Sequence, residues 1–143
     1  SHSALGQDLY SVAATEQTYR HLQTLSGEIL NAGYSVIIDA AFLKSWQRRL
    51  FEDLGRGRGV DLRILHCKAD TATLRQRVES RARRGHDPSE ADLSVLEHQL
   101  ASHEPLDAQE RAATLTVDTQ KDDLIQELTR ALATVDEPSS APA

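Results

Sequence analysis

The chain has 143 residues, with 16 lysines and arginines against 22 aspartates and glutamates, and a net charge of −6. Its length suits one globular domain, and its hydrophobic content of 39% excludes a disordered or fibrous chain. No apolar run reaches the roughly 18 to 20 residues of a membrane span, and the acidic balance argues against a duplex-nucleic-acid binder, whose phosphate contacts require a basic surface.

The cysteine and methionine counts bear on the cellular compartment and on whether the sequence is part of a longer protein. Cys67 is the single cysteine and cannot form an internal disulfide, so we expect a cytoplasmic protein. The sequence contains no methionine, which predicts that these residues are a piece of a longer protein. Residues 135–143 are rich in Pro, Ser and Ala, which is typical of a disordered tail, so we expect a single α/β domain over residues 1–134.

The first half of the chain predicts two helices and two strands. Apolar residues recur at steps of three and four over residues 8–31, as in an amphipathic helix. Residues 34–39 are short, β-branched and apolar on both faces, which is typical of a strand buried between layers of helices. A second helix is expected over 44–54, ended by the glycines that follow it, and a second strand over 60–67.

The second half continues the alternation. A basic helix is expected over 71–84, and Gly-His-Asp-Pro at 85–88 breaks it. A further helix over 90–103, a third strand over 114–119 and a last helix over 121–134 complete the chain. Strands that alternate with helices through short turns predict an α/β fold, with a parallel sheet flanked by helices.

One carboxylate lies where such a sheet collects ligands. Asp39 follows the predicted strand 34–39 at its carboxyl end, where a carboxylate can hold Mg²⁺ directly or through water. The alternative is an ordinary aspartate that caps the next turn. Position alone does not decide between the two roles.

A cluster of positive charge lies in this otherwise acidic chain. Residues 75–84 contain five arginines and only one acidic residue, Glu79. Helical spacing places Arg77, Arg81 and Arg84 on one face, and arginine matches phosphate oxygens in a bidentate way. We therefore expect a mobile lid over a phosphate-rich ligand; the alternative is a solvated helix face.

The glycines at 55, 57 and 59 do not form a phosphate-binding loop. Such a loop has the pattern Gly-x-x-x-x-Gly-Lys-Ser/Thr between a strand and a helix, and the sequence contains no such pattern. Here the glycines follow a predicted helix and precede a predicted strand. They are interpreted as a helix stop.

Several strings of the sequence occur in the order of a known family. They are Ala-Gly-Tyr-Ser-Val-Ile-Ile-Asp-Ala-Ala-Phe-Leu at 32–43, Leu-Arg-Gln-Arg-Val at 74–78, Asp-Pro-Ser-Glu-Ala-Asp at 87–92 and Val-Leu-Glu-His-Gln-Leu at 95–100. Together they resemble the P-loop kinase-like ATP-binding domain that is often fused to an aminoglycoside phosphotransferase-like domain. This group is similar to polynucleotide kinases, zeta toxins and gluconate kinases, and the resemblance extends over about residues 6–134.

The resemblance implies ATP and Mg²⁺ as ligands and the hydroxyl of a small molecule as the phosphoryl acceptor. It makes Asp39 the Walker-B-like carboxylate, acting in catalysis and in metal binding. It places Thr15 and Tyr19 on the helix that borders the acceptor pocket. It also implies a lid that closes on the triphosphate, formed by Arg77, Arg81 and Arg84.

Two departures from the family pattern favour alternatives. The family usually has Asp-Ala-Thr where this chain has Ala41 in the third position, so a hydroxyl near the metal is missing. The phosphate-binding loop and the acceptor segment after it do not occur, so we expect this fragment to be inactive alone. The first alternative is a non-catalytic regulatory or scaffold module that has lost nucleotide binding, and the second is a nucleic-acid 5′-hydroxyl kinase.

The resemblance also bears on assembly. The family's sheet places the strand of the phosphate-binding loop between the strands predicted at 34–39 and 60–67. Without it, both strands have unpaired edges, which promote association. We expect either direct pairing of these two strands or pairing between chains, and so a homo-oligomer.

Overall fold

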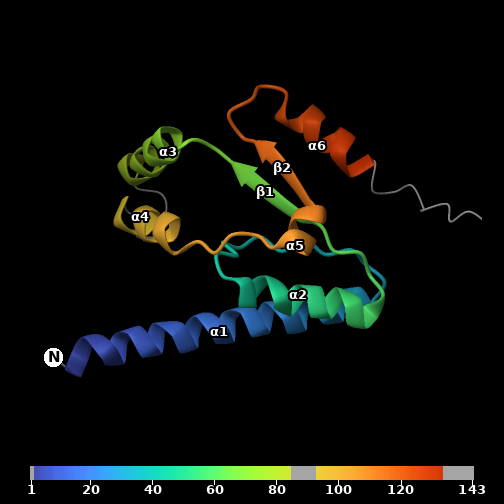
Figure 1. Ribbon diagram of the computed structural model, residues 1–143, viewed down its shortest axis with the longest axis horizontal. Coiled ribbons are helices and arrows are strands. Elements are labelled where there is room, and N and C mark those ends of the chain that lie inside the picture. The colour runs from blue at the N-terminus through green and yellow to red at the C-terminus, as the bar shows by residue number, and fades with distance from the viewer. Residues whose placement is uncertain (1, 85–92, 134–143) are drawn as a thin grey trace, which may run out of the picture. The chain divides into compact units, whose positions relative to one another are not determined.

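The computed structural model describes residues 2–84 and 93–133, apart from the side chains of residues 2–11, 82, 84 and 131 (Figure 1). The chain divides into two compact units. Unit 1 comprises Ser1–Leu62 and His103–Pro105, and unit 2 comprises Arg63–Ser102 and Leu106–Ala143. No helix in the described part of the chain is long and apolar enough to cross a membrane.

Unit 1 is built on two helices, α1 (His2–Asn31) and α2 (Ser45–Arg58), that lie side by side. Gln23 Nε2 of α1 donates a hydrogen bond of 2.7 Å to the Leu50 carbonyl of α2. Arg58 Nε donates to Asn31 Oδ1 at 3.2 Å near the ends of both helices. The two helices run in the same direction, so the chain between them must cross back along their length (Figure 1).

The core of unit 1 is aromatic. Phe51 and Tyr19 are buried, with exposed fractions of 3% and 7%. The Tyr19 ring meets those of Phe42 and Trp46 edge to face at 5.5 Å, and Phe42 meets Phe51 in the same way at 5.3 Å. Such pairs contribute about 0.5–1.5 kcal/mol each beyond the area that they bury. This cluster shows that Phe42, Trp46 and Phe51 are packing residues.

Helix α2 is longer than the glycine pattern predicts. It runs through Gly55 and Gly57 to Arg58 and ends where Gly59 takes the left-handed conformation at φ 62°. A glycine inside a helix costs only about 1 kcal/mol relative to alanine, which packing can offset. Gly55 is buried, and a Cβ there would lie 3.0 Å from the Val60 carbonyl oxygen, so close approach explains this glycine.

The strand predicted at residues 34–39 is not formed: within the described residues this segment is neither helix nor strand. A strand requires a hydrogen-bonded neighbour, and here no described segment pairs with it. The expected direct pairing between this segment and the strand predicted at 60–67 would join unit 1 to unit 2, and it stays a prediction. Pairing between chains stays a prediction.

Unit 2 contains a parallel pair of strands, β1 (Ile64–Lys68) and β2 (Thr114–Asp118), in a register that sets Ile64 beside Thr114. Helix α6 (Leu124–Ala133) packs on β2, and Val117 of β2 is almost fully buried. The other helices are α3 (Thr71–Arg84), α4 (Leu93–Ser102) and α5 (Ala108–Ala112). The predicted α/β class, with a parallel sheet and flanking helices, is confirmed.

The element bounds in unit 2 follow the sequence patterns closely. Helix α3 has the predicted bounds, and β2 ends one residue earlier than predicted. Strand β1 begins only at Ile64, and α5 is an additional helix, which Asp107 caps by accepting a 2.8 Å bond from the Glu110 amide. The break predicted at 85–88, the string at 87–92 and the tail at 135–143 lie outside the described residues.

Candidate functional site

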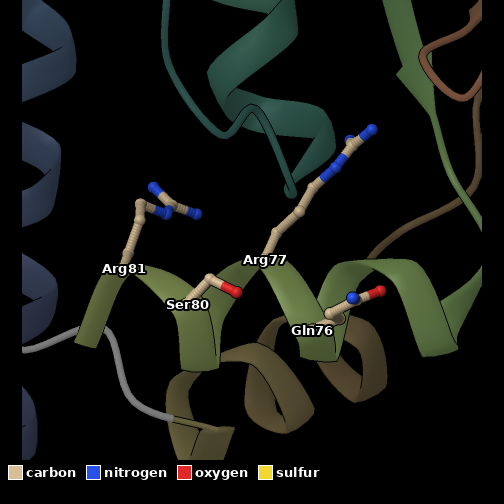
Figure 2. Close-up of a pocket in the computed structure, with 4 residues that line it drawn as sticks. All are labelled: Gln76, Arg77, Ser80 and Arg81. Atoms are coloured by element: carbon tan, nitrogen blue, oxygen red, sulfur yellow. The ribbon is translucent and has the colours of Figure 1, made fainter. Parts of the chain in front are cut away.

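The arginine-rich helix α3 lines an open hollow of about 430 Å³. Its walls are Gln76, Arg77, Ser80 and Arg81, and both arginines are exposed. Figure 2 shows the Arg77 and Arg81 side chains leaving the same side of the helix, one turn apart. Two of the three predicted lid arginines therefore share one surface. Arg84 is the last residue of α3, and its side chain lies outside the described part.

Arg77 is held in a fixed position. Its Nη1 donates to Thr119 Oγ1 at 2.8 Å, and its Nη2 donates to the Thr119 carbonyl at 2.9 Å. Thr119 follows β2 directly, and its hydroxyl and amide both donate to the Lys68 carbonyl at the end of β1. Arg77 thus joins α3 to the carboxyl ends of both parallel strands, where ligands collect in α/β folds.

Arg81 is exposed and has no hydrogen bond or ion pair with any other residue that the structure describes. Arg75 differs, because its Nη2 lies 3.2 Å from Glu97 Oε1 of α4. Arg83 is exposed and does not line the hollow. Among the described residues, the hollow therefore presents one anchored guanidinium, that of Arg77, and one without a carboxylate partner, that of Arg81.

The beginning of α3 is tied to the segment after β2. Asp70 precedes the helix, and its Oδ1 accepts a 2.7 Å bond from the Thr73 amide, which makes Asp70 the N-cap. Gln120 Nε2 donates to Asp70 Oδ2 at 2.7 Å and to Thr73 Oγ1 at 3.0 Å, and Gln120 Oε1 accepts from the Asp70 amide at 2.8 Å. The Thr73 amide bond, followed by the Gln120 side chain, lowers the pKa of Asp70.

The sequence predictions did not include Asp70 or Gln120. An aspartate directly before the first helical residue is an N-cap signal, so the role of Asp70 could have been predicted from the neighbouring sequence. Gln120 lies 50 residues further along the chain, and the sequence around it contains no motif that predicts a contact with Asp70. Its role depends on the parallel pairing that brings the ends of β1 and β2 together.

Asp39, Thr15 and Tyr19 all lie in unit 1, apart in sequence from the α3 arginines of unit 2, and the two sets are described separately. Asp39 is exposed, and no other described residue forms a hydrogen bond or ion pair with it. Thr15 is exposed on α1. Tyr19 is buried, and its hydroxyl accepts a 3.2 Å bond from the Phe42 amide, so it supports the segment after Asp39.

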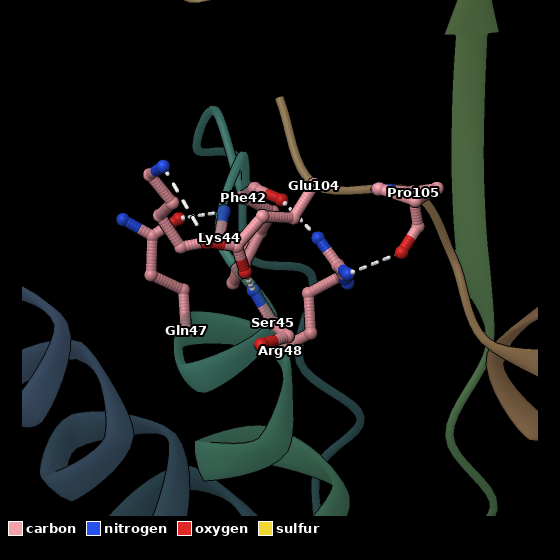
Figure 3. A network of polar contacts seen from close by, with 7 residues as sticks. All are labelled: Phe42, Lys44, Ser45, Gln47, Arg48, Glu104 and Pro105. Atoms are coloured by element: carbon pink, nitrogen blue, oxygen red, sulfur yellow. Dashed lines mark hydrogen bonds and ion pairs between the residues drawn. The ribbon is translucent and has the colours of Figure 1, made fainter. Parts of the chain in front are cut away.

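A second polar network surrounds the start of α2 (Figure 3). Glu104 Oε2 accepts from the Ser45 amide at 2.8 Å, and the Glu104 amide donates to the Leu43 carbonyl at 2.8 Å. Lys44 Nζ lies 3.4 Å from Glu104 Oε1. The Ser45 amide bond is the main cause, and Lys44 a lesser one, of a lowered pKa for the Glu104 carboxyl.

Arg48 completes this network from inside unit 1. It is 4% exposed, and it donates to the carbonyls of Phe42 at 3.0 Å and Pro105 at 3.2 Å. Phe42 has φ 48°, an uncommon value for a residue with a side chain. The network therefore holds a strained loop, which begins three residues after Asp39, in one conformation.

The donor sets suit phosphate and magnesium to different degrees. Guanidinium groups at Arg77 and Arg81 match phosphate oxygens. Mg²⁺ is usually bound through one or two carboxylates together with water and phosphate oxygens, so the Asp39 carboxylate, which has no partner among the described residues, fits it. The described residues contain no group of three or more His, Cys, Asp or Glu that would hold a metal without such help.

A family model described as an AAA domain matches residues 2–106 of the chain. The matched region contains α1–α4 and β1, and with them Asp39 and the α3 arginines, whereas β2 and α6 lie beyond it. No curated protein and no solved structure matches the chain.

Proposed function

The chain belongs to the AAA domain family, and we propose that the Arg77–Arg81 surface of α3 binds the phosphate groups of ATP. The family supports a nucleotide-binding, P-loop kinase-like domain in general. The observation that carries the specific proposal is Arg81, an exposed cation beside an open hollow with no partner among the described residues.

The two arginines have different parts in this proposal. Arg77 is already committed to Thr119, so its guanidinium plane is fixed and offers its remaining N–H donors in a set direction. Arg81 has no partner in the described part of the chain, so its donors can reach the ligand from one helical turn away. A fixed donor contributes orientation, whereas a free one closes over the bound anion and accounts for most of the charge neutralisation.

The carboxylate of unit 1 would hold the magnesium ion. Mg²⁺, when bound, neutralises negative charge on the phosphate oxygens. Asp39 supplies an oxygen ligand, and Tyr19 and Arg48 hold the neighbouring Phe42 backbone in place. Thr15, exposed on α1, borders the pocket for an acceptor hydroxyl in this proposal, and Tyr19 contributes through the shape of the helix face.

We further propose that the complete reaction transfers the γ-phosphoryl group of ATP to a hydroxyl of a small molecule in the cytoplasm. Asp39 and the α3 arginines support this function because they occupy the positions where the resemblance places the Walker-B-like carboxylate and the lid arginines. These 143 residues are inactive by themselves in this proposal, since their sequence contains no Gly-x-x-x-x-Gly-Lys-Ser/Thr loop. Positioning and charge neutralisation supply most of the catalysis in phosphoryl transfer, so nucleotide binding can persist without turnover.

The test is a calorimetric titration of the chain with ATP and Mg²⁺. Arg81→Ala should weaken binding by about tenfold, because a charge-assisted hydrogen bond contributes about 1.5–3 kcal/mol. Arg83→Ala is the matched control, an exposed arginine of the same helix outside the hollow, and should weaken binding by less than about twofold. Equal losses in the two variants, or no binding of ATP by the unaltered chain, would contradict the proposal.

One observation favours a second function, that of a regulatory module that does not catalyse. Ala41 lies where the resemblance has a hydroxyl near the metal. This module has lost nucleotide binding, so a titration in which the chain binds no ATP, with or without Mg²⁺, would support it. Magnesium-dependent binding that Asp39→Asn abolishes would support the kinase instead.

A further inference from the structure

Two consecutive residues of unit 2, Thr119 and Gln120, hold helix α3 at two places along its length. Gln120 forms two hydrogen bonds with Asp70, at 2.7 and 2.8 Å, and one with Thr73, at 3.0 Å, at the start of the helix. Thr119 accepts two bonds from Arg77, which lies one turn further along the helix than Thr73. A short turn after β2 therefore contacts α3 on both sides of its first turn.

These contacts follow the side of α3 that leads to the hollow. Thr73, Arg77 and Arg81 are four residues apart, so helical spacing places them on the same side of the helix. Gln120 binds the first of them and Thr119 binds the second, whereas Arg81 has no partner among the described residues. The turn thus fixes the part of α3 that precedes Arg81, and the Arg81 side chain lines the hollow (Figure 2).

The turn is itself attached to both strands. The Gln120 amide donates to Asp118 Oδ1 at the end of β2, at 3.0 Å. The amide and the hydroxyl of Thr119 donate to the Lys68 carbonyl at the end of β1, at 2.8 and 3.0 Å. Because the paired strands anchor this turn, the Gln120 side chain can hold the start of α3 in a set position relative to the sheet.

The contacts of Gln120 require an amide side chain. Its Oε1 accepts from the Asp70 amide, and its Nε2 donates to the Asp70 carboxylate and to the Thr73 hydroxyl. A carboxylate at position 120 would lie against that of Asp70, and a methyl group would reach neither partner. Without Gln120, the bonds from Arg77 would be the remaining attachment of α3 to this turn, and the helix could tilt about them.

We propose that Gln120 is a positioning residue for phosphate binding, which acts by fixing the direction of α3 and so the placement of the Arg77 and Arg81 guanidinium groups. The inference rests on the proposed function, in which these two arginines bind the phosphate groups of ATP. Gln120 does not line the hollow, so it acts through α3 and not by touching the nucleotide. Donors that are held in place bind an anion more tightly, because less freedom is lost on binding.

Calorimetric titration with ATP and Mg²⁺ measures the effect on affinity. Gln120→Ala should raise the dissociation constant of ATP about threefold, because the arginines are then less well oriented before the ligand binds. Gln126→Ala is the matched control, an exposed glutamine of α6 in the same unit, and should change the constant by less than about 1.5-fold. The titrations are made at a temperature where circular dichroism shows every variant to be folded.

An exchange of side chains between positions 70 and 120 separates a positioning role from a general loss of stability. Gln120→Glu alone sets two carboxylates together, and Asp70→Asn alone loses one bond whichever way its amide turns. Each should raise the dissociation constant about threefold. In the double variant, the new amide at position 70 donates to the new carboxylate at position 120, and both backbone amides keep an acceptor. The ATP affinity should then return to within about 1.5-fold of that of the unaltered chain.

A measurement without nucleotide follows the Arg77 side chain directly. Nuclear magnetic resonance of the guanidinium group reports rotation about its Cζ–Nη bonds, which the two bonds to Thr119 slow. Rotation should be slow in the unaltered chain and in the double variant, and faster in Gln120→Ala. Equal rotation in the unaltered chain and Gln120→Ala would show that Gln120 does not hold Arg77 in place, and would overturn the inference.

The outcomes distinguish a failure of this inference from a failure of the proposed function. If the unaltered chain binds ATP and Gln120→Ala binds it as tightly, the proposed function stands and the positioning role is wrong. A double variant that binds ATP no better than the two single variants would also overturn the positioning role alone. If the unaltered chain binds no ATP, both are wrong.

Discussion

Arg77 holds Thr119 through two hydrogen bonds, one to the side-chain oxygen at 2.8 Å and one to the carbonyl at 2.9 Å. The two residues are 42 positions apart. Since Thr119 also donates twice to Lys68, one arginine connects a helix to the ends of two strands.

We expect Arg77→Ala to destabilise the chain as well as weaken ATP binding. The loss removes two hydrogen bonds, each worth about 0.5–1.5 kcal/mol, with the smaller value favoured because Arg77 is exposed. Urea unfolding followed by far-UV circular dichroism measures the change. Arg81→Ala is the control and should leave the free energy of unfolding within about 0.5 kcal/mol of the original, because Arg81 has no described partner to lose.

Asp70 should make the stability of the chain depend on pH. Its pKa is lowered in the folded state, so its contribution is present above the ordinary aspartate range and is lost as the pH falls through the lowered value. Asp70→Asn keeps an N-cap acceptor without the charge. Its deficit in urea midpoint should therefore be largest near neutral pH and shrink in acid. A deficit that grows in acid would contradict the assignment.

In unit 1, the hydrogen bond to Glu104 should likewise be present at neutral pH and weaken in acid. Hydrogen bonds from Ser45 lower its pKa, so protonation in acid weakens the link between residues 103–105 and α2. In Glu104→Gln, we expect the Ser45 amide to exchange with solvent faster at neutral pH than in the unaltered chain. At a pH below the lowered pKa the two proteins should exchange alike. Unchanged exchange at neutral pH would show that Ser45 is protected by other contacts.

Two glycines at the end of α2 should respond to alanine in opposite directions. Gly57 lies in the helix and a Cβ there would meet nothing within 4 Å, so Gly57→Ala should stabilise the chain by about 0.5–1 kcal/mol. Gly59 has equal space but φ 62°, so Gly59→Ala should destabilise it by about 1 kcal/mol. Thermal unfolding of the two variants side by side measures both changes. Changes of the same sign would contradict the left-handed cap.

Local patterns predicted the elements whose formation depends on nearby residues. The end of α3 was predicted because Gly-His-Asp-Pro at 85–88 follows Arg84 and breaks a helix. Residues 34–39 were predicted as a strand from composition, yet a strand forms only when a neighbour supplies hydrogen bonds, and composition does not reveal the neighbour. Gly55 shows the converse, because α2 continues through this glycine, where a Cβ would lie only 3.0 Å from the Val60 carbonyl oxygen.

In the candidate site, too, local sequence predicts some features, whereas others depend on contacts between distant segments. Arg77 and Arg81 could be placed on one face from helical spacing alone, and the structure confirms that they line one hollow. The difference between them could not be predicted, because Thr119 anchors Arg77 through a contact between distant segments. Roles for Asp39, Thr15 and Tyr19 stay predictions.

The aromatic core of unit 1 has a counterpart in composition: all six aromatic residues of the sequence lie in unit 1, and unit 2 contains no Phe, Trp or Tyr. Tryptophan fluorescence and near-ultraviolet absorbance from the protein therefore report on unit 1 alone. An adenine ring bound on unit 2 would have no aromatic side chain there to stack on. Its own absorbance would also stand out from an optically silent part of the chain, which makes the nucleotide itself the probe of that unit.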